Sequence, residues 1–418
     1  MGDMTTSQTD THRFPELLGQ GLVATGVLLL PALSLIVDSG YSLGAALLLL
    51  GGLVLGWRGA TQRIGRRETW VLVALLGYVL ANLVAQAVHD LPWRDFDRPS
   101  RFLLAIPAFL LLLRFPPRVE HFMAGLVAGA SLTGLWALWQ KLIEGVPRAM
   151  GHTHVIQFGN ISMLMGLLCL AGLGWAAMRR HHARAWMGVL ILGGLLGMLG
   201  SLMSGSRGGW VGLPLVALAF YRAYAPYVSR RLQALIVGGG TIMLALILAI
   251  PQTGVAHRVG QAFSNVEQYL VEGNANTSVG LRFDMWSAAA QAIPRHPVLG
   301  WDREGYMAFE ADLIERGGLS PAIANFGHPH NEVLNTLLFE GIIGLFGLLL
   351  LYGAALWRFL PGIESNDLSR RSMSLCGALL PICFIDFGLS QSFFEHNSGV
   401  MVYAFFLVVL AALVRRFE

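Results

Sequence analysis

Apolar residues run through most of this chain in long blocks, and short polar stretches separate them. A bilayer core about 30 Å thick requires roughly 20 mostly apolar residues in a spanning helix. We expect membrane helices at 20–37, 43–57, 70–88, 102–114, 121–141, 160–178, 187–204, 209–225, 234–251, 332–355, 372–390 and 398–414. The pattern therefore predicts an all-α integral membrane protein with about 12 spans.

One long stretch, residues 252–331, is polar in character. Within it, 255–271 and 281–293 carry apolar residues at three- and four-residue spacing, which predicts helices that lie on a surface. On the second of these, Arg282 and Trp286 are four residues apart and share one face. The chain therefore divides into nine spans, a large helical external loop and three further spans, over 1–251, 252–331 and 332–418.

Composition and charge agree with a membrane protein and predict its orientation. The chain is 55% hydrophobic and only 13% charged, too little charge to cover a soluble protein of this size. Most of the 29 Lys and Arg residues fall in short loops on one side, and such loops are retained in the cytoplasm. Both termini are thus predicted to be cytoplasmic. No basic stripe alternates with aromatic residues, so we expect membrane lipids and no nucleic acid as partners.

Polar clusters precede five of the even-numbered spans and are therefore expected at the outer face, namely 98–101, 151–160, 204–209, 328–331 and 395–398. Helix N-termini at that face carry unpaired N–H groups and partial positive charge, which attract anions. Helix capping is the alternative for Ser204, Ser206, Asn331 and Ser398. Capping does not explain Arg207, because a cation at a helix N-terminus opposes the dipole unless an anion lies between them. The clusters, the Arg282 helix and Arg148, which lies just before the 151–160 cluster, supply candidate substrate-binding residues: Arg101, Arg148, Asn160, Ser206, Trp286, His328 and Asn331.

His328 and His330 alternate just before the tenth span. Helical metal-binding pairs are usually three or four residues apart, and no cysteine or acidic cluster supplies further ligands, so we expect no metal. His330 is better suited to act as a neutral base, since a helix N-terminus disfavours its protonated form. Glu332 and His328 are alternative bases. On a regular helix Glu340 would lie about 15 Å from His330, which indicates a structural or conformational role.

Five short motifs follow one another in the order Ser206-Arg-Gly-Gly209, Arg282-Phe-Asp-Met-Trp286, His296-Pro-Val-Leu-Gly300, His330-Asn-Glu-Val-Leu334 and Phe339-Glu-Gly-Ile-Ile-Gly344. Their order, together with twelve expected spans and one late external loop, resembles the bacterial O-antigen ligase family. That family shares its membrane fold with O-antigen polymerases and some protein O-oligosaccharyltransferases. The motif positions match His330 to the family's essential histidine, and Arg207 and Arg282 to its essential arginines.

The resemblance implies a GT-C-like membrane glycosyltransferase fold in the bacterial inner membrane. It also implies transfer of a polysaccharide from undecaprenyl diphosphate to the lipid A-core oligosaccharide at the periplasmic face, by an inverting displacement without metal or soluble cofactor. The chemistry of the residues fits such a reaction. Arginines stabilise a departing diphosphate, and a positioned neutral histidine removes the proton of a sugar hydroxyl.

Two other functions remain as alternatives. Arg148 and Gly159 have ten residues between them, which matches an Arg-x10-Gly pattern associated with the polymerases. Polymerases are expected to show two sizeable external loops, and the single loop here favours a ligase. An ion-coupled transporter would explain Glu340 and Asp386 inside spans, but such carriers show two related halves, and this sequence shows no such repeat.

Overall fold

A computed structural model describes residues 7–57, 64–206, 208–249 and 255–418. Within these ranges the chain is helical and has no strand. The α-helices are α1 (Ser7–Leu33), α2 (Tyr41–Gly51), α3 (Arg66–Val88), α4 (Asp97–Arg114), α5 (Val119–Leu142), α6 (Val155–Ala171), α7 (Leu173–Ala177), α8 (Ala183–Ser204), α9 (Leu213–Tyr224), α10 (Arg230–Ala249), α11 (Val255–Glu272), α12 (Gly280–Ala292), α13 (Arg303–Glu315), α14 (Glu332–Phe359), α15 (Leu368–Gly388) and α16 (Asn397–Arg415).

Each apolar segment expected from the sequence overlaps one or more of these helices. Among the described residues, eight helices are long and apolar enough to cross a membrane, and a shorter apolar helix covers Tyr41–Gly56. The all-helical class and the multi-pass membrane character are thereby confirmed. The twelve-span layout, its orientation and the three-part division of the chain stay predictions.

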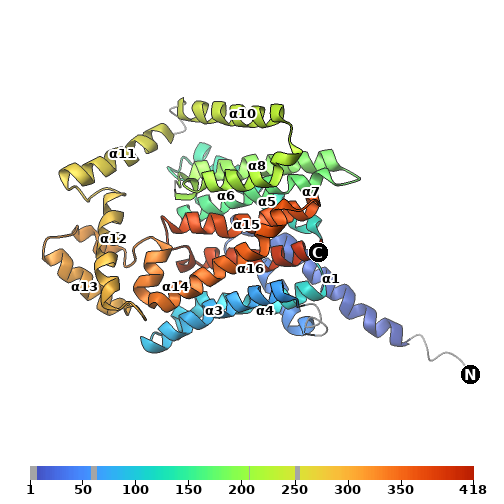
Figure 1. The fold of residues 1–418 in the computed structure, drawn as a ribbon, viewed down its shortest axis with the longest axis horizontal. Coiled ribbons are helices and arrows are strands. Elements are labelled where there is room, and N and C mark those ends of the chain that lie inside the picture. The colour runs from blue at the N-terminus through green and yellow to red at the C-terminus, as the bar shows by residue number, and fades with distance from the viewer. Residues whose placement is uncertain (1–6, 58–63, 207, 250–254) are drawn as a thin grey trace, which may run out of the picture.

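The long helices run side by side in one bundle, and α12 and α13 lie beyond one end of it (Figure 1). Helix α14 begins at this end, whereas α1 begins and α16 ends at the opposite end. The two ends of the bundle thus differ, because α12 and α13 lie beyond one end only. We refer to the end near α12 and α13 as the outer end and to the other as the terminal end.

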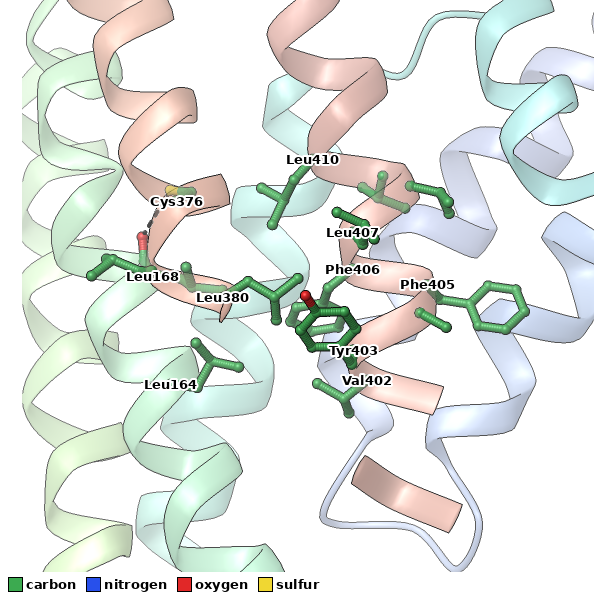
Figure 2. Packing of buried hydrophobic residues seen from close by; sticks show 14 of the residues in the cluster. Leu164, Leu168, Cys376, Leu380, Val402, Tyr403, Phe405, Phe406, Leu407 and Leu410 are labelled. Carbon is green, nitrogen blue, oxygen red and sulfur yellow. Dashed lines mark hydrogen bonds between the residues drawn. The ribbon is translucent and has the colours of Figure 1, made fainter. Parts of the chain in front are cut away.

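Helices α15 and α16 form the buried centre of the bundle. Figure 2 shows Leu380 of α15 beside Tyr403 and Phe406 of α16. The Cys376 thiol donates to the Leu168 carbonyl of α6 across 3.6 Å, in the same layer. Close packing of this kind limits movement of the helix ends and of the short loops that join them.

The segment 296–301 docks into a break in α14. Gly341 adopts φ 62° and ψ −157°, which interrupts the helix, and the amide of Ile342 donates to the carbonyl of Pro297 at 2.9 Å. A Cβ at Gly341 would lie 2.2 Å from the Val298 carbonyl oxygen, and one at Gly300 would lie 2.5 Å from the Phe339 backbone. Glycine is required on both sides of this contact. Two of the sequence motifs therefore form one backbone contact that fixes the segment 296–301 to α14.

Glu340 directly precedes the break, so the helix from Glu332 to Glu340 is regular, as expected from the sequence. Its side chain lines a cavity together with Arg98, Arg303 and Glu395. The segment 252–331 contains one α-helix more than the sequence pattern predicted. Helix α13 packs Tyr306 and Phe309 against the α12 and α14 side chains that surround them.

Candidate functional site

His330 lies in the short segment that leads into α14 at the outer end. Its backbone is left-handed, with φ 49°, a conformation that is uncommon for a residue other than glycine. The indole N–H of Trp286 on α12 donates to the Pro329 carbonyl at 2.9 Å. Asn331 caps α14 by accepting from the Leu334 amide at 3.0 Å, and its own amide donates to the Leu389 carbonyl at 3.3 Å. These contacts hold His330 in place from both sides.

The imidazole of His330 is oriented by Gln391, which is 2% exposed. Nδ1 of His330 is hydrogen-bonded to Oε1 of Gln391, and Nε2 of Gln391 lies 3.0 Å from Nε2 of His396. An amide oxygen only accepts, so the first contact requires the proton of the neutral imidazole on Nδ1. Nε2 of His330 then carries the lone pair, which is the atom a general base uses.

The histidines of this cluster are held neutral near pH 7. Burial lowers the pKa of His330 from its ordinary value, a hydrogen bond with Gln391 opposes this shift, and Arg282 and His154 lower the pKa further. Burial also lowers the pKa of His328 and of His396 to about 4. A neutral His330 was expected from the sequence, and burial is the largest cause of its lowered pKa.

The loop 389–396, which carries Gln391, is fastened by two carboxylates. Oε2 of Glu332 accepts from the amides of Phe393 and Phe394, the latter at 3.0 Å. Glu395 forms ion pairs with Arg98 and with Arg303, the latter at 2.9 Å. Glu332 therefore holds the loop that orients His330.

His328, the other alternative base, contacts the backbone of the same segment. Its Nδ1 accepts from the amide N–H of His330 at 3.3 Å, and the two rings lie 4.1 Å apart. That Nδ1 lone pair is directed at the chain rather than at an incoming substrate. Of the three candidate bases, His330 is the one whose Nε2 is left available to a substrate by these contacts.

Of the two arginines expected to bind an anion, Arg282 lies in the described part of the chain. The charge of Arg282 on α12 contributes to the lowered pKa of His330, which places it within electrostatic reach of the imidazole. Arg207 lies outside the described residues. On its N-terminal side, Ser206 donates to Oδ1 of Asn160 at 3.3 Å, and Nε of Arg148 donates to the Ser204 carbonyl at 2.8 Å.

The other side of this stretch packs on the loop that carries Gln391. A Cβ at Gly208 would lie 1.8 Å from the Ser390 hydroxyl oxygen. The residues on both sides of Arg207 are thus wedged between α6 and the loop 389–396. Asn160 is fully buried, and its Nδ2 has no partner among the described residues.

The structure also places Arg101, which was expected to bind substrate, and the residues that were considered as helix caps. Arg101 forms an ion pair with Asp97 at 2.6 Å, one turn earlier on α4, and its side chain is 16% exposed. Of the four residues considered as helix caps, Asn331 is one, whereas His396 precedes α16 and Ser398 lies within that helix. Ser204 ends α8, and its hydroxyl donates to the Ser201 carbonyl at 2.7 Å.

Gln391 is the functional candidate that the sequence pattern did not single out. His154 and His396 belong to polar clusters noted in the sequence, and the structure stacks their rings with centroids 5.6 Å apart. The polar run Ser390-Gln391-Ser392 between two apolar blocks was the available signal for Gln391. In the described part of the chain, no three His, Cys, Asp or Glu side chains are grouped to hold a metal ion.

Comparison with known proteins adds a family to this geometry. Residues 192–349 match the family model described as O-antigen ligase, and this range contains Arg207, Arg282 and His330. A Haemophilus influenzae protein, described only as uncharacterized, is 29% identical over 333 residues, which is 80% of this chain and 83% of that protein. Residues 192–349 of this chain thus form a domain of the O-antigen ligase family.

Proposed function

We propose that this protein is an O-antigen ligase that transfers a polysaccharide from undecaprenyl diphosphate to the lipid A-core oligosaccharide. The observation that carries the proposal is a neutral, oriented His330 within electrostatic reach of Arg282. A base and a cation at one site match the two demands of this reaction. One group must take a proton from the attacking hydroxyl, and another must stabilise the departing diphosphate.

The donor is proposed to bind through its diphosphate. Arg282 and Arg207 contact the phosphate oxygens, and Arg148 adds positive charge beside Ser204 and Ser206. Guanidinium groups form paired hydrogen bonds to phosphate, so they fix the leaving group in position as well as neutralise it. The apolar polyprenyl chain lies in the surrounding lipid, in keeping with the apolar outer surfaces of the helices.

The acceptor sugar is activated by His330. Its hydroxyl oxygen forms a bond to the anomeric carbon of the donor while the bond from that carbon to the diphosphate oxygen breaks. The hydroxyl proton passes to Nε2 of His330, and the electron pair of the broken bond leaves with undecaprenyl diphosphate. Attack opposite the leaving group inverts the anomeric centre. Trp286 and Asn331 position the His330 segment rather than take part in the chemistry.

The proposed setting is the bacterial inner membrane, with the outer end of the bundle facing the periplasm. The GT-C-like architecture, the twelve spans and the cytoplasmic termini belong to this proposal. They are supported by the family match and by the start of α1 and the end of α16 at the terminal end, opposite α12 and α13. No soluble cofactor takes part in the proposed reaction.

An O-antigen polymerase or a protein O-oligosaccharyltransferase of the same superfamily is the alternative. The Arg148–Gly159 spacing has a structural explanation, because both residues pack against the Ser204–Ser206 stretch. A Cβ at Gly159 would lie 2.1 Å from the Ser204 hydroxyl oxygen. The spacing therefore serves packing and does not by itself favour polymerisation.

Complementation separates these activities in cells. The gene is expressed in one strain that lacks its own ligase and in another that lacks its own polymerase, both matched to the donor glycan. Lipopolysaccharide is then resolved on a gel. We expect capped lipopolysaccharide to return in the ligase-deficient strain and not in the polymerase-deficient one. The reverse pattern would show that the protein is a polymerase and would contradict the proposed ligase activity.

A further inference from the structure

A second cavity opens at the outer end, beside the histidine cluster. Its volume is about 360 Å³, and residues of α2, α4, α6 and α16 contribute to its walls, among them Tyr41, Asp97, His154, Gln157, His396 and Asn397. Ligand sites usually enclose about 300–1,000 Å³. This cavity is at the small end of that range, which suits a short segment of a ligand rather than a whole polymer.

Gln157 is the unusual residue of this cavity. Its side chain is fully buried, yet within the described part of the chain neither its amide nitrogen nor its amide oxygen has a hydrogen-bond partner. A buried amide without partners costs about 1–3 kcal/mol. A ligand in the cavity that both donates and accepts hydrogen bonds would remove this cost.

The charges around the cavity argue against an anion. Helices α6 and α16 begin at its wall, which alone would favour negative charge. However, Asp97 and Glu395 also line it, and Arg98, the one arginine among the described lining residues, is paired with Glu395. Burial lowers the pKa values of His154 and His396, so both rings are neutral near pH 7. The lining side chains that the structure describes offer no excess positive charge to a diphosphate.

The polar side chains of the cavity suit a neutral polyhydroxyl compound. A sugar hydroxyl donates one hydrogen bond and accepts others, so it requires donors and acceptors side by side. The amides of Gln157 and Asn397, the Asp97 carboxylate and two neutral imidazoles provide both. The ring of Tyr41 adds an apolar surface for the face of a pyranose.

The cavity is connected to the proposed base by two hydrogen bonds. His396 lines the cavity, its Nε2 contacts the Gln391 amide nitrogen at 3.0 Å, and the Gln391 oxygen bonds to His330. A ligand held by Gln157 and His396 is therefore adjacent to the catalytic cluster. The outer end thus has an arginine-bearing part, near Arg282, and a neutral part in the cavity.

We propose that this cavity binds a neutral sugar residue of the acceptor glycan, with Gln157 as its main hydrogen-bonding side chain. The inference rests on the proposed function for the identity of the acceptor. It assigns the two substrates to different chemistry: the diphosphate of the donor binds at the arginines, and the acceptor sugar binds at a neutral pocket.

Binding to the purified full-length protein tests the proposal without turnover. The probes are inorganic pyrophosphate and an outer-core oligosaccharide freed of lipid A and of phosphate, each titrated by calorimetry. In Gln157→Leu we expect about tenfold weaker oligosaccharide binding and unchanged pyrophosphate binding. Arg282→Ala should do the reverse. Asn397→Ala, at an exposed position, should weaken the oligosaccharide by about threefold.

Thermal unfolding separates ligand binding from a structural role. Leucine removes an unsatisfied buried amide at similar volume, so Gln157→Leu should unfold at the same or a higher temperature. A lower unfolding temperature would make Gln157 structural and contradict the proposal. Three further results would contradict the proposal. They are equal oligosaccharide affinity in the wild type, Gln157→Leu and Asn397→Ala, no oligosaccharide binding to the wild type, and loss of pyrophosphate binding in Gln157→Leu. Absence of glycosyl transfer in a separate assay would contradict the proposed function instead.

Discussion

Buried polar side chains have different partners at the two ends of the helical bundle. At the terminal end the side chain of Arg358 is fully buried and lies 2.8 Å from Glu418 and 3.6 Å from Glu68. Arg67, Arg370 and Arg415 pair with the same two carboxylates. Each carboxylate there is paired with more than one arginine within the protein itself. Such a network holds helices together and has little to offer a ligand.

The outer end brings together histidines, amides and arginines, and some of its buried amide groups have no hydrogen-bond partner among the described residues. His330 keeps one ring nitrogen available, and Gln157 and Asn160 keep buried amide groups without described partners. The carboxylates Glu332 and Glu395 fasten the surrounding loops. Single buried atoms of Glu68 and Arg358 at the terminal end also have no described hydrogen-bond partner, but both side chains form ion pairs. Gln157 is uncharged and lines a cavity, so its unsatisfied amide favours the outer end as the place for a ligand.

The largest expected effect is at the outer end. His330→Ala should insert and fold normally but lose transfer by roughly 10²- to 10⁴-fold, because no group then takes the hydroxyl proton. The rate is measured with purified protein and lipid-linked glycan. Exposed His257→Ala is the matched control and should retain the wild-type rate. A rate of His330→Ala close to that of the wild type would remove the functional contrast between the two ends.

At the terminal end the expected effect is on stability. Arg358→Ala should lower the free energy of unfolding by about 3–5 kcal/mol, because it leaves Glu68 buried and deprives it of one of its two cations. Chemical or thermal denaturation in detergent measures this loss. The rate per folded molecule should stay near the wild-type value. Arg66→Ala, at an exposed neighbouring position, is the control and should change stability far less.

A smaller effect is expected from Arg207→Lys. Lysine keeps the charge but loses the two-pronged contact with phosphate, so transfer should fall on the order of 10²-fold. Arg316→Lys provides the comparison, since Arg316 is exposed and pairs with Asp312 on α13. Full activity of Arg207→Lys would mean that this position contributes charge or packing only.

The smallest effect concerns pH. Transfer requires neutral His330, so activity should fall as pH decreases through its lowered pKa, and the acid limb should lie below the ordinary value of 6.5. Removing the charge of Arg282 favours the protonated ring. The limb should therefore move to higher pH in Arg282→Gln, apart from any loss of amplitude. An unmoved limb in that variant would separate Arg282 from the base.

Much of the fold follows from the sequence because length and hydropathy dominate in a bilayer. The apolar blocks overlap helices throughout, and the expected helix at 281–293 lies close to α12. Helix α13 was missed because Arg303, Glu304, Glu310, Asp312 and Glu315 interrupt its apolar face. The break in α14 was missed because a glycine inside an apolar run looks helical until a second segment docks on it.

The sequence predicted which residue types form the site, but it did not predict which distant residues contact one another. The motifs brought out Arg282 and His330, but Gln391 lies 61 residues from His330 in the sequence. Contacts over such separations depend on how α14 and α15 pack, which local patterns do not encode. The same holds for Gln157, whose missing partners are visible only in the folded chain.

Purified protein supplied with lipid-linked glycan and one acceptor at a time gives the most direct test of the central claim. One reaction contains lipid A-core, and the other contains a second lipid-linked unit. The account predicts glycan attached to lipid A-core, with release of undecaprenyl diphosphate, in the wild type and not in His330→Ala. Glycan growth on the second lipid-linked unit alone, or equal transfer by His330→Ala, would contradict it.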